Sequence, residues 1–259
     1  DLVADTLSER LVAGSVHFGG GTPNMLAPEE VGAVLAKLAE RFDFSEGAEI
    51  AAEIDPRTLT PEWVRAAAGG GMNRASLGVQ DLDPTVQKAI NREQPLETVA
   101  RAADLLRSVG ISSLNMDLMY GLPRQTLEGL EKTIDQALAL HPDRLSLFGY
   151  AHVPWMKSHQ KLIRDEELPD SRLRYFMQQR AADLLEERGW RRLGLDHFAK
   201  PDDSLAAAAA EGRMRRNFQG YTTDEAPVLI GFGASSIGRM PQGYVQNASA
   251  VPIWREKLE

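Results

Sequence analysis

Cysteine is absent from this chain of 259 residues, and basic residues are outnumbered by acidic ones. Without cysteine, the chain can form neither a disulfide nor a metal site held by its own thiolates. Its 29 lysines and arginines against 37 aspartates and glutamates give a formal net charge of −8, which disfavours a nucleic-acid-binding face. No window holds the roughly 18 apolar residues that a membrane span needs, and no signal-peptide pattern is present. We therefore expect a cytoplasmic protein with no nucleic acid partner and no membrane span.

The chain does contain a repeated alternation of strand-like and helix-like segments. Strand-like segments fall near 15–18, 49–54, 74–79, 111–117, 144–150, 191–196 and 228–232. Helical patterns are clearest near 28–41, 60–68, 96–109 and 172–188. This alternation predicts one α/β domain with a parallel sheet and outer helices, either a (β/α) barrel or an open doubly wound sheet. The stretch 151–171 has little apolar periodicity and is predicted to be a long functional loop.

A turn rich in glycine follows the first strand-like segment. The sequence there is His17-Phe18-Gly19-Gly20-Gly21-Thr22-Pro23. Three consecutive residues without a Cβ let the backbone come within hydrogen-bond distance of a ligand and adopt dihedral angles closed to other residues. We interpret the turn as part of a binding site for a small molecule. The alternative is that it is only a tight connection between a strand and a helix.

Polar side chains stand where the next strands end. Glu53 and Asp55 close the second segment, Gln80 closes the third, and Asp117 lies in the fourth. A carboxylate can accept two hydrogen bonds from a ribose diol, and a glutamine can both donate and accept. These side chains therefore predict a nucleoside-like site on one rim, where Gly20, Gly21, Glu53, Gln80 and Asp117 converge. The alternative is that each polar residue only caps the following helix.

Eight motifs in this order resemble one enzyme family over nearly the whole chain. They are His17–Pro23, Glu53–Pro56, Gly78–Asp81, Asn91–Gln94, Met116–Pro123, Tyr150–Pro154, Asp196–Asp203 and Asn217–Thr223. The family is the oxygen-independent coproporphyrinogen III oxidases (dehydrogenases), which are radical S-adenosylmethionine enzymes of haem biosynthesis. The resemblance implies an incomplete parallel (β/α) barrel that is open where the large substrate enters.

The resemblance also implies two bound molecules of S-adenosylmethionine. The first would contact Gly20, Gly21 and Thr22 at its methionine end, Glu53 near its sugar and Ile237 at its adenine. The second would be bound by four other residues, Gln80, Arg92, Asp117 and Ala151. Gly21 and Thr22 would also lie close to it.

The reaction that the resemblance implies begins with reductive cleavage of S-adenosylmethionine by a 4Fe-4S cluster, fed by an electron donor. The resulting 5′-deoxyadenosyl radical takes a hydrogen atom from the β-carbon of a substrate propionate. Loss of CO₂ and one electron then leaves a vinyl group, and two such rounds convert coproporphyrinogen III to protoporphyrinogen IX. No general base is needed for the hydrogen transfer, so the catalytic residues of this chain are left unknown.

The chain departs from the family at the cluster. The family holds its cluster with cysteines in a CxxxCxxC motif ahead of the glycine turn, and the five histidines here have no spacing that replaces three of them. We therefore expect no metal ligands in this chain. The interpretation is that residues 1–259 form a partial core domain truncated at both ends, without the first strand, the cluster loop and a C-terminal domain, and inactive alone.

Substrate carboxylates need positive charge, which an acidic chain must gather locally. Arg213, Arg215 and Arg216 form the densest basic group, and we select Arg216 as the propionate contact because it adjoins the Asn217 motif. Lys157, Lys161 and Arg164 lie in the long loop. Two alternatives remain open: a radical S-adenosylmethionine haem chaperone or methyltransferase-like relative, and a porphyrin-binding module without a cluster.

Overall fold

The computed structural model describes residues 1–111, 113–218 and 220–259. Ser112, at the start of one predicted strand, and Gln219, within the Asn217 motif, lie outside the described residues. The large sheet contains β1 (Val12–Phe18), β2 (Asp43–Ile54), β3 (Arg74–Gln80), β4 (Ser113–Tyr120), β5 (Arg144–Gly149), β6 (Arg191–Leu193) and β7 (His197–Ala199). The helices are α1 (Leu2–Thr6), α2 (Pro28–Arg41), α3 (Pro61–Gly69), α4 (Pro84–Ala89), α5 (Leu96–Ser108), α6 (Leu127–Leu138), α7 (Ser171–Glu187), α8 (Ser204–Ala210) and α9 (Val251–Glu256).

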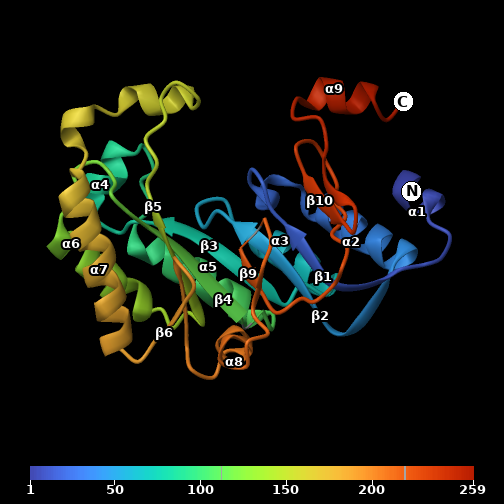
Figure 1. The fold of residues 1–259 in the computed structure, drawn as a ribbon, viewed down its shortest axis with the longest axis horizontal. Helices are drawn as coiled ribbons and strands as arrows, with labels where there is room; N and C mark the ends of the chain where they lie inside the picture. Colours follow the sequence, from blue (N-terminus) through green and yellow to red (C-terminus); the bar gives the residue numbers. More distant parts are fainter. Residues whose placement is uncertain (112, 219) are drawn as a thin grey trace.

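The sheet has the strand order β1-β2-β3-β4-β5-β7-β6, and β1 to β5 are parallel neighbours. It curls into a half-barrel, as Figure 1 shows for the strands crossing the centre of the molecule. The predicted α/β fold with an incomplete parallel barrel is therefore confirmed. Sequential parallel strands joined by helices produce this arrangement because each crossover must return over the same face of the sheet.

Alternation along the strands separates the two faces of the sheet. In β3, Ala75, Leu77 and Val79 are buried, whereas Arg74 and Ser76 face a cavity on the other side. The buried set packs with apolar residues of α2, α3, α5, α6 and α7 in one large core. Because side chains alternate with a period of two, the strands deliver apolar groups to the helices and polar groups to the inside of the half-barrel.

Local capping fixes where several helices begin. The Thr60 hydroxyl accepts a hydrogen bond from the Trp63 N–H at 3.2 Å, and Asp83 accepts one from the Thr85 N–H at 2.7 Å. Pro61 and Pro84 follow these caps at the first helical position, where a missing N–H has no cost. The four helices predicted from sequence correspond to α2, α3, α5 and α7.

Two predicted strands differ in the structure. The segment 191–196 supplies only β6 at the outer edge, because β7 turns back and pairs antiparallel with both β5 and β6. The segment 228–232 is not a strand, and Leu229 forms only an isolated bridge to Arg239. Sequence alternation could not show these differences, since strands of three residues carry too little periodicity.

Smaller elements surround the half-barrel. Two hairpins, β8–β9 (Arg215–Arg216 and Tyr221–Thr222) and β10–β11 (Ile237–Met240 and Gly243–Gln246), lie outside the large sheet. Short 3-10 helices are η1 (Pro23–Met25), η2 (Ser158–Leu162) and η3 (Asp165–Glu167). The segment 151–170 projects beyond the end of β5, at the upper left of Figure 1. Among the described residues, no helix combines the length and apolar character that crossing a bilayer requires.

Candidate functional site

The glycine turn after β1 is joined to the end of β2 by a shared carboxylate. The Gly20 N–H donates to Glu53 Oε2 at 3.2 Å, and His17 Nε2 lies 3.4 Å from Glu53 Oε1. A Cβ on Gly19 would stand 2.9 Å from His17 Nε2 and 3.0 Å from Glu53 Oε1, so a larger residue would separate this pair. A residue larger than glycine at position 19 would therefore have to displace the His17 and Glu53 side chains.

The next two glycines are required by their backbone conformation. Gly20 and Gly21 have φ values of +73° and +84°, and apart from the adjoining residues of the chain no described heavy atom lies within 4 Å of the position a Cβ would take on either. Such dihedral angles are strained for residues with a Cβ. The empty space beside both residues leaves their backbone accessible to a ligand. Thr22 follows in an extended conformation and its carbonyl accepts the Met25 N–H.

Glu53 carries a negative charge at neutral pH. The hydrogen bond from His17 lowers the pKa of Glu53 most strongly, burial opposes that effect, and the Gly20 N–H and the nearby imidazole lower the pKa further. The carboxylate is thus held as an acceptor at the end of β2, where it can bind hydroxyl or amino groups of a ligand.

A second cluster lies at the end of β3. Gln80 has a φ of +67°, and the pairing of β3 with β4 shifts register between Gly78 and Gln80. Arg92 donates to the Gly78 carbonyl at 3.0 Å and lies 3.4 Å from Asp55 Oδ2. A Cβ on Gly78 would come within 3.1 Å of Gln80 and 3.2 Å of Arg92, so glycine at this position lets both side chains approach the strand.

Polar atoms in this second cluster are left without partners. Arg92 Nε and Gln94 Oε1 are buried and have no hydrogen-bond partner among the described residues. Burial lowers the pKa of Arg92, although the Asp55 charge opposes this effect. Because a buried polar atom without a partner costs free energy, such atoms mark a place where a ligand or an ordered water completes the hydrogen bonding.

Asp117 lies further inside the half-barrel, on β4. Its Oδ2 accepts from Ser76 Oγ at 2.8 Å and its Oδ1 accepts from Asn115 Nδ2 at 2.7 Å. Burial raises the pKa of Asp117, against these hydrogen bonds. Neither Asp117 nor Glu53 caps a helix, so the capping alternative is excluded for these two residues. Asp81 does serve the fold, since it is fully buried and binds the Asp83 N–H, Gln125 and Thr133.

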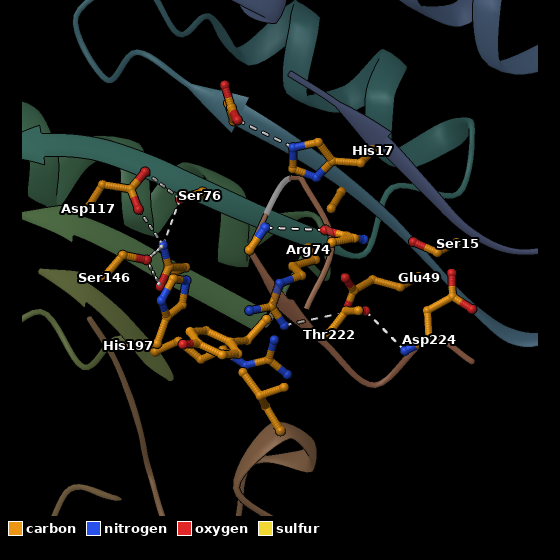
Figure 2. Close-up of a pocket in the computed structure, with 18 of the residues that line it drawn as sticks. Ser15, His17, Glu49, Arg74, Ser76, Asp117, Ser146, His197, Thr222 and Asp224 are labelled. Atoms are coloured by element: carbon orange, nitrogen blue, oxygen red, sulfur yellow. Dashed lines mark hydrogen bonds and ion pairs between the residues drawn. The ribbon is translucent and has the colours of Figure 1, made fainter. Parts of the chain in front are cut away.

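One cavity of about 200 Å³ brings Glu53 and Asp117 together inside the half-barrel. Figure 2 shows Asp117, Ser76 and Ser146 on one side of it and Glu49, Thr222 and Asp224 on the other. The lining carboxylates are Glu49, Glu53, Asp117 and Asp224, against two lining cations, Arg74 and Arg144. The cavity therefore keeps an acidic excess even with Asp117 protonated.

The two cavity arginines are differently paired. Arg144 Nε binds both oxygens of Asp203, at 2.8 and 3.0 Å, and both side chains are buried. Arg74 lies 3.4 Å from Glu49 Oε2 and donates to Ser113 Oγ at 3.0 Å, and burial lowers its pKa. The bidentate partner neutralises Arg144, so the acidic character of the cavity is set by the remaining carboxylates.

Three predicted site residues lie on other elements. The Ala151 carbonyl, just after β5, accepts from Gln160 Nε2 at 3.1 Å. Ile237 begins the β10–β11 hairpin and is half-buried. Arg216 is exposed on β8, with its guanidinium 5.5 Å from the centre of the Tyr221 ring. Of the ten predicted site residues, all of them described by the structure, only Glu53 and Asp117 line the cavity.

Sequence reasoning missed several cavity residues on the inner face. Ser15, Glu49, Arg74, Ser76 and Ser146 all line the cavity. Arg74, Ser76 and Ser146 alternate along their strands with buried apolar residues, and this alternation is the available signal. It is unusual for parallel strands, which are more often apolar on both faces, and it indicates a polar interior.

Comparison with known proteins identifies the fold family. The model of the radical SAM superfamily matches residues 2–137, just over half of the chain. The chain belongs to the radical SAM superfamily. Superfamily membership implies S-adenosylmethionine and a 4Fe-4S cluster.

Similar radical SAM proteins extend the match beyond residue 137. The oxygen-independent coproporphyrinogen III oxidase of Bradyrhizobium diazoefficiens is 51% identical over 257 residues, covering 99% of this chain and 57% of that protein. The protein of the same name from Cereibacter sphaeroides is 47% identical over 259 residues, covering 100% of this chain and 57% of that protein. The chain thus spans 57% of the length of these relatives.

A solved radical SAM structure has the same architecture. The coproporphyrinogen III oxidase of Escherichia coli superposes with a TM-score of 0.92 at 38% identity, covering 95% of this chain and 57% of that one. The match therefore includes the half-barrel and almost everything around it.

The residues of this radical SAM chain fit one of the two expected groups. The open glycine turn, the Glu53 carboxylate and the partnerless atoms of Arg92 and Gln94 suit a ligand with many hydrogen-bonding groups. The cluster needs thiolates, and the sequence has no cysteine. The described residues also contain no group of three or more His, Asp or Glu placed to hold a metal ion. None of these residues is suited to hold the cluster.

Proposed function

We propose that this chain is the S-adenosylmethionine-binding core of an oxygen-independent coproporphyrinogen III oxidase. The observation that carries the proposal is the contact of the Gly20 N–H and His17 with Glu53, because it joins an open glycine turn to an ionised carboxylate that lines an acidic cavity. The identity of 51% with a relative of that name over 99% of the chain supports the substrate assignment.

In this proposal the glycine turn and Glu53 hold the first S-adenosylmethionine. The backbone of Gly20, Gly21 and Thr22 lies beside its methionine end, Glu53 accepts hydrogen bonds from its ribose, and Ile237 contacts its adenine. The acidic excess of the cavity favours a cationic sulfonium over an anionic ligand. When bound, this cofactor supplies the means of abstracting a hydrogen atom from an unactivated carbon.

A second S-adenosylmethionine is assigned to the cluster at the end of β3 and to Asp117. Arg92 Nε and Gln94 Oε1 need partners there, and Gln80 presents an amide from a residue with positive φ. Asp117 and the Ala151 backbone complete the set. The residues act by binding, by orienting and by excluding water, and none of them needs to move a proton for the hydrogen transfer.

The substrate in this proposal is coproporphyrinogen III, with Arg216 as one contact to a propionate. Its exposed guanidinium over Tyr221 remains free to bind a carboxylate with its outer edge. An external one-electron donor is required, and we expect a cytoplasmic setting, where the thiolate ligands of a cluster stay reduced.

The test is an anaerobic turnover assay of the complete protein that contains this chain, after cluster reconstitution. Coproporphyrinogen III, S-adenosylmethionine and a reductant are supplied, and protoporphyrinogen IX and 5′-deoxyadenosine are quantified. Formation of both products supports the proposal. Glu53→Gln should lower the rate of product formation, whereas Glu62→Gln, on the exposed start of α3, should leave that rate unchanged. Haem binding without vinyl formation would instead favour a haem chaperone.

A further inference from the structure

The segment that follows β5 exposes large apolar side chains. Trp155 is 76% exposed, Met156 73% and Leu162 85%. A single exposed apolar residue is ordinary, but three within eight positions of one loop are unusual for a surface that remains bare. The segment stands beyond the end of β5 (Figure 1).

The same segment is firmly anchored. The buried Gln160 side chain accepts from the Val153 N–H at 2.6 Å and donates to the Ala151 carbonyl at 3.1 Å. His152 joins the Tyr150 hydroxyl at 3.1 Å to Asp165 at 3.1 Å. The exposed side chains are therefore presented by a backbone held in one conformation, which lowers the entropy cost of binding a ligand.

Anchoring also comes from apolar contacts below the loop. Ile163 and Leu168 pack against a small buried cluster of Val86, Leu122 and Tyr150. The loop is thus packed through Ile163 and Leu168, and Trp155, Met156 and Leu162 take no part in that cluster.

Positive charge accompanies the exposed apolar residues. Lys157 and Lys161 are exposed, and neither forms an ion pair with any described residue. Arg164, by contrast, binds Glu167 at 2.6 Å, and Glu167 also binds Arg124 at 2.8 Å. Asp165 and Glu167 are engaged by His152 and these arginines, whereas the neighbouring Glu166 is exposed and forms no ion pair with a described residue. Within Trp155–Leu162 the only formal charges are those of Lys157 and Lys161.

The cavity and the segment Trp155–Leu162 therefore differ in charge. The cavity holds four carboxylates and two arginines, one of them neutralised by Asp203. A ligand with several carboxylates is disfavoured in the cavity and attracted to Lys157 and Lys161.

We propose that the segment Trp155–Leu162 is the recognition surface for a flat, apolar macrocycle with carboxylates at its edge. Trp155, Met156 and Leu162 would contact the ring face, and Lys157 and Lys161 would bind peripheral carboxylates. The inference rests on the proposed function, since it assigns a part of the protein to the substrate of that reaction.

The experiment measures binding of coproporphyrin III, a stable fluorescent relative of the substrate, to the 259-residue chain by fluorescence anisotropy. The variants are Trp155→Ala and the double variant K157E/K161E. Matched controls are Tyr175→Ala, an exposed aromatic on α7, and K132E/K257E, which changes the net charge by the same amount at distant positions. Thermal melting of each variant verifies that it is folded.

We expect K157E/K161E to weaken binding about tenfold and to remove most of the salt dependence, because two exposed charge contacts are reversed. Trp155→Ala should weaken binding several-fold through lost ring contact, and both controls should bind like the wild type. Equal binding by all variants, or no binding by the wild type, overturns the inference. The turnover assay tests the proposed function separately. If the complete protein shows no turnover but its porphyrin binding still depends on Lys157 and Lys161, the proposed function is refuted and the proposed binding surface stands.

Discussion

Replacing Glu53 by glutamine tests whether the Glu53 charge helps the glycine turn to bind a ligand, because the substitution changes only one oxygen of the side chain. Glutamine keeps the size of the side chain and one acceptor oxygen but removes the negative charge. In the structure, one carboxylate oxygen accepts the Gly20 N–H and the other lies beside His17. The variant therefore loses one of two acceptor positions and the attraction to the imidazole, with little change in packing.

The expected effect on stability is small because the Glu53 side chain is 46% exposed. Solvent screens the charge, so we expect a loss of folding free energy below ~1 kcal/mol. The effect on S-adenosylmethionine should be larger, since a ligand covers the site and excludes water. Losing one charge-assisted hydrogen bond in such a site costs about 1.5 kcal/mol, or roughly a tenfold weaker Kd.

Isothermal titration calorimetry of the 259-residue chain with S-adenosylmethionine measures this change directly. Glu62→Gln is the matched control, because Glu62 is exposed on α3 and pairs only with Arg65 among the described residues. An unchanged affinity in Glu53→Gln, or an equal loss in both variants, would refute the assignment of Glu53 to the cofactor.

The pH dependence of the same titration tests the role of His17. The hydrogen bond from His17 lowers the pKa of Glu53, so binding by the wild type should persist on acidification until that lowered pKa is reached. In His17→Ala the pKa of Glu53 should return towards its ordinary value, and affinity should decline at a higher pH. An unchanged acidic limb would show that His17 does not set the charge state of Glu53.

Three further predictions concern other parts of the chain. Burial raises the pKa of Asp117, so its ionisation opposes folding above the unfolded pKa of ~3.9. Asp117→Asn should raise the melting temperature by about 2–4 °C at pH 7, and this gain should disappear below about pH 4. A difference in melting temperature that does not change with pH would contradict the prediction. In Gly194→Ala, the new Cβ would overlap the Tyr221 hydroxyl, which accepts the Leu195 N–H at 3.0 Å; protease cleavage near β9 should increase, and wild-type resistance would oppose the prediction. Anaerobic reconstitution of the 259-residue chain with iron and sulfide should give no 4Fe-4S absorbance and no 5′-deoxyadenosine, because thiolates are lacking; stoichiometric cluster would overturn that account.

Most of the correct fold prediction came from local sequence patterns, each within about a dozen residues. The helices that begin at Pro28 and Pro61 follow from proline at the first turn and from apolar periodicity within about a dozen residues. The short strand β7 was missed because its pairing with β5 depends on residues more than fifty positions away. Its three residues show no period of their own.

The sequence by itself determined the types of residue at the strand ends and the conformational freedom of the glycine turn, because both depend on local chemistry. It also determined that no thiolate is available. Only the tertiary structure decided that Glu53 binds the Gly20 backbone and that Arg92 reaches both Gly78 and Asp55. These contacts join different strands and loops, and their geometry depends on the register of parallel pairing, which no short window of sequence specifies. The acidic cavity arises for the same reason, since curling of the sheet gathers side chains from β1 to β5 and β7 into one interior.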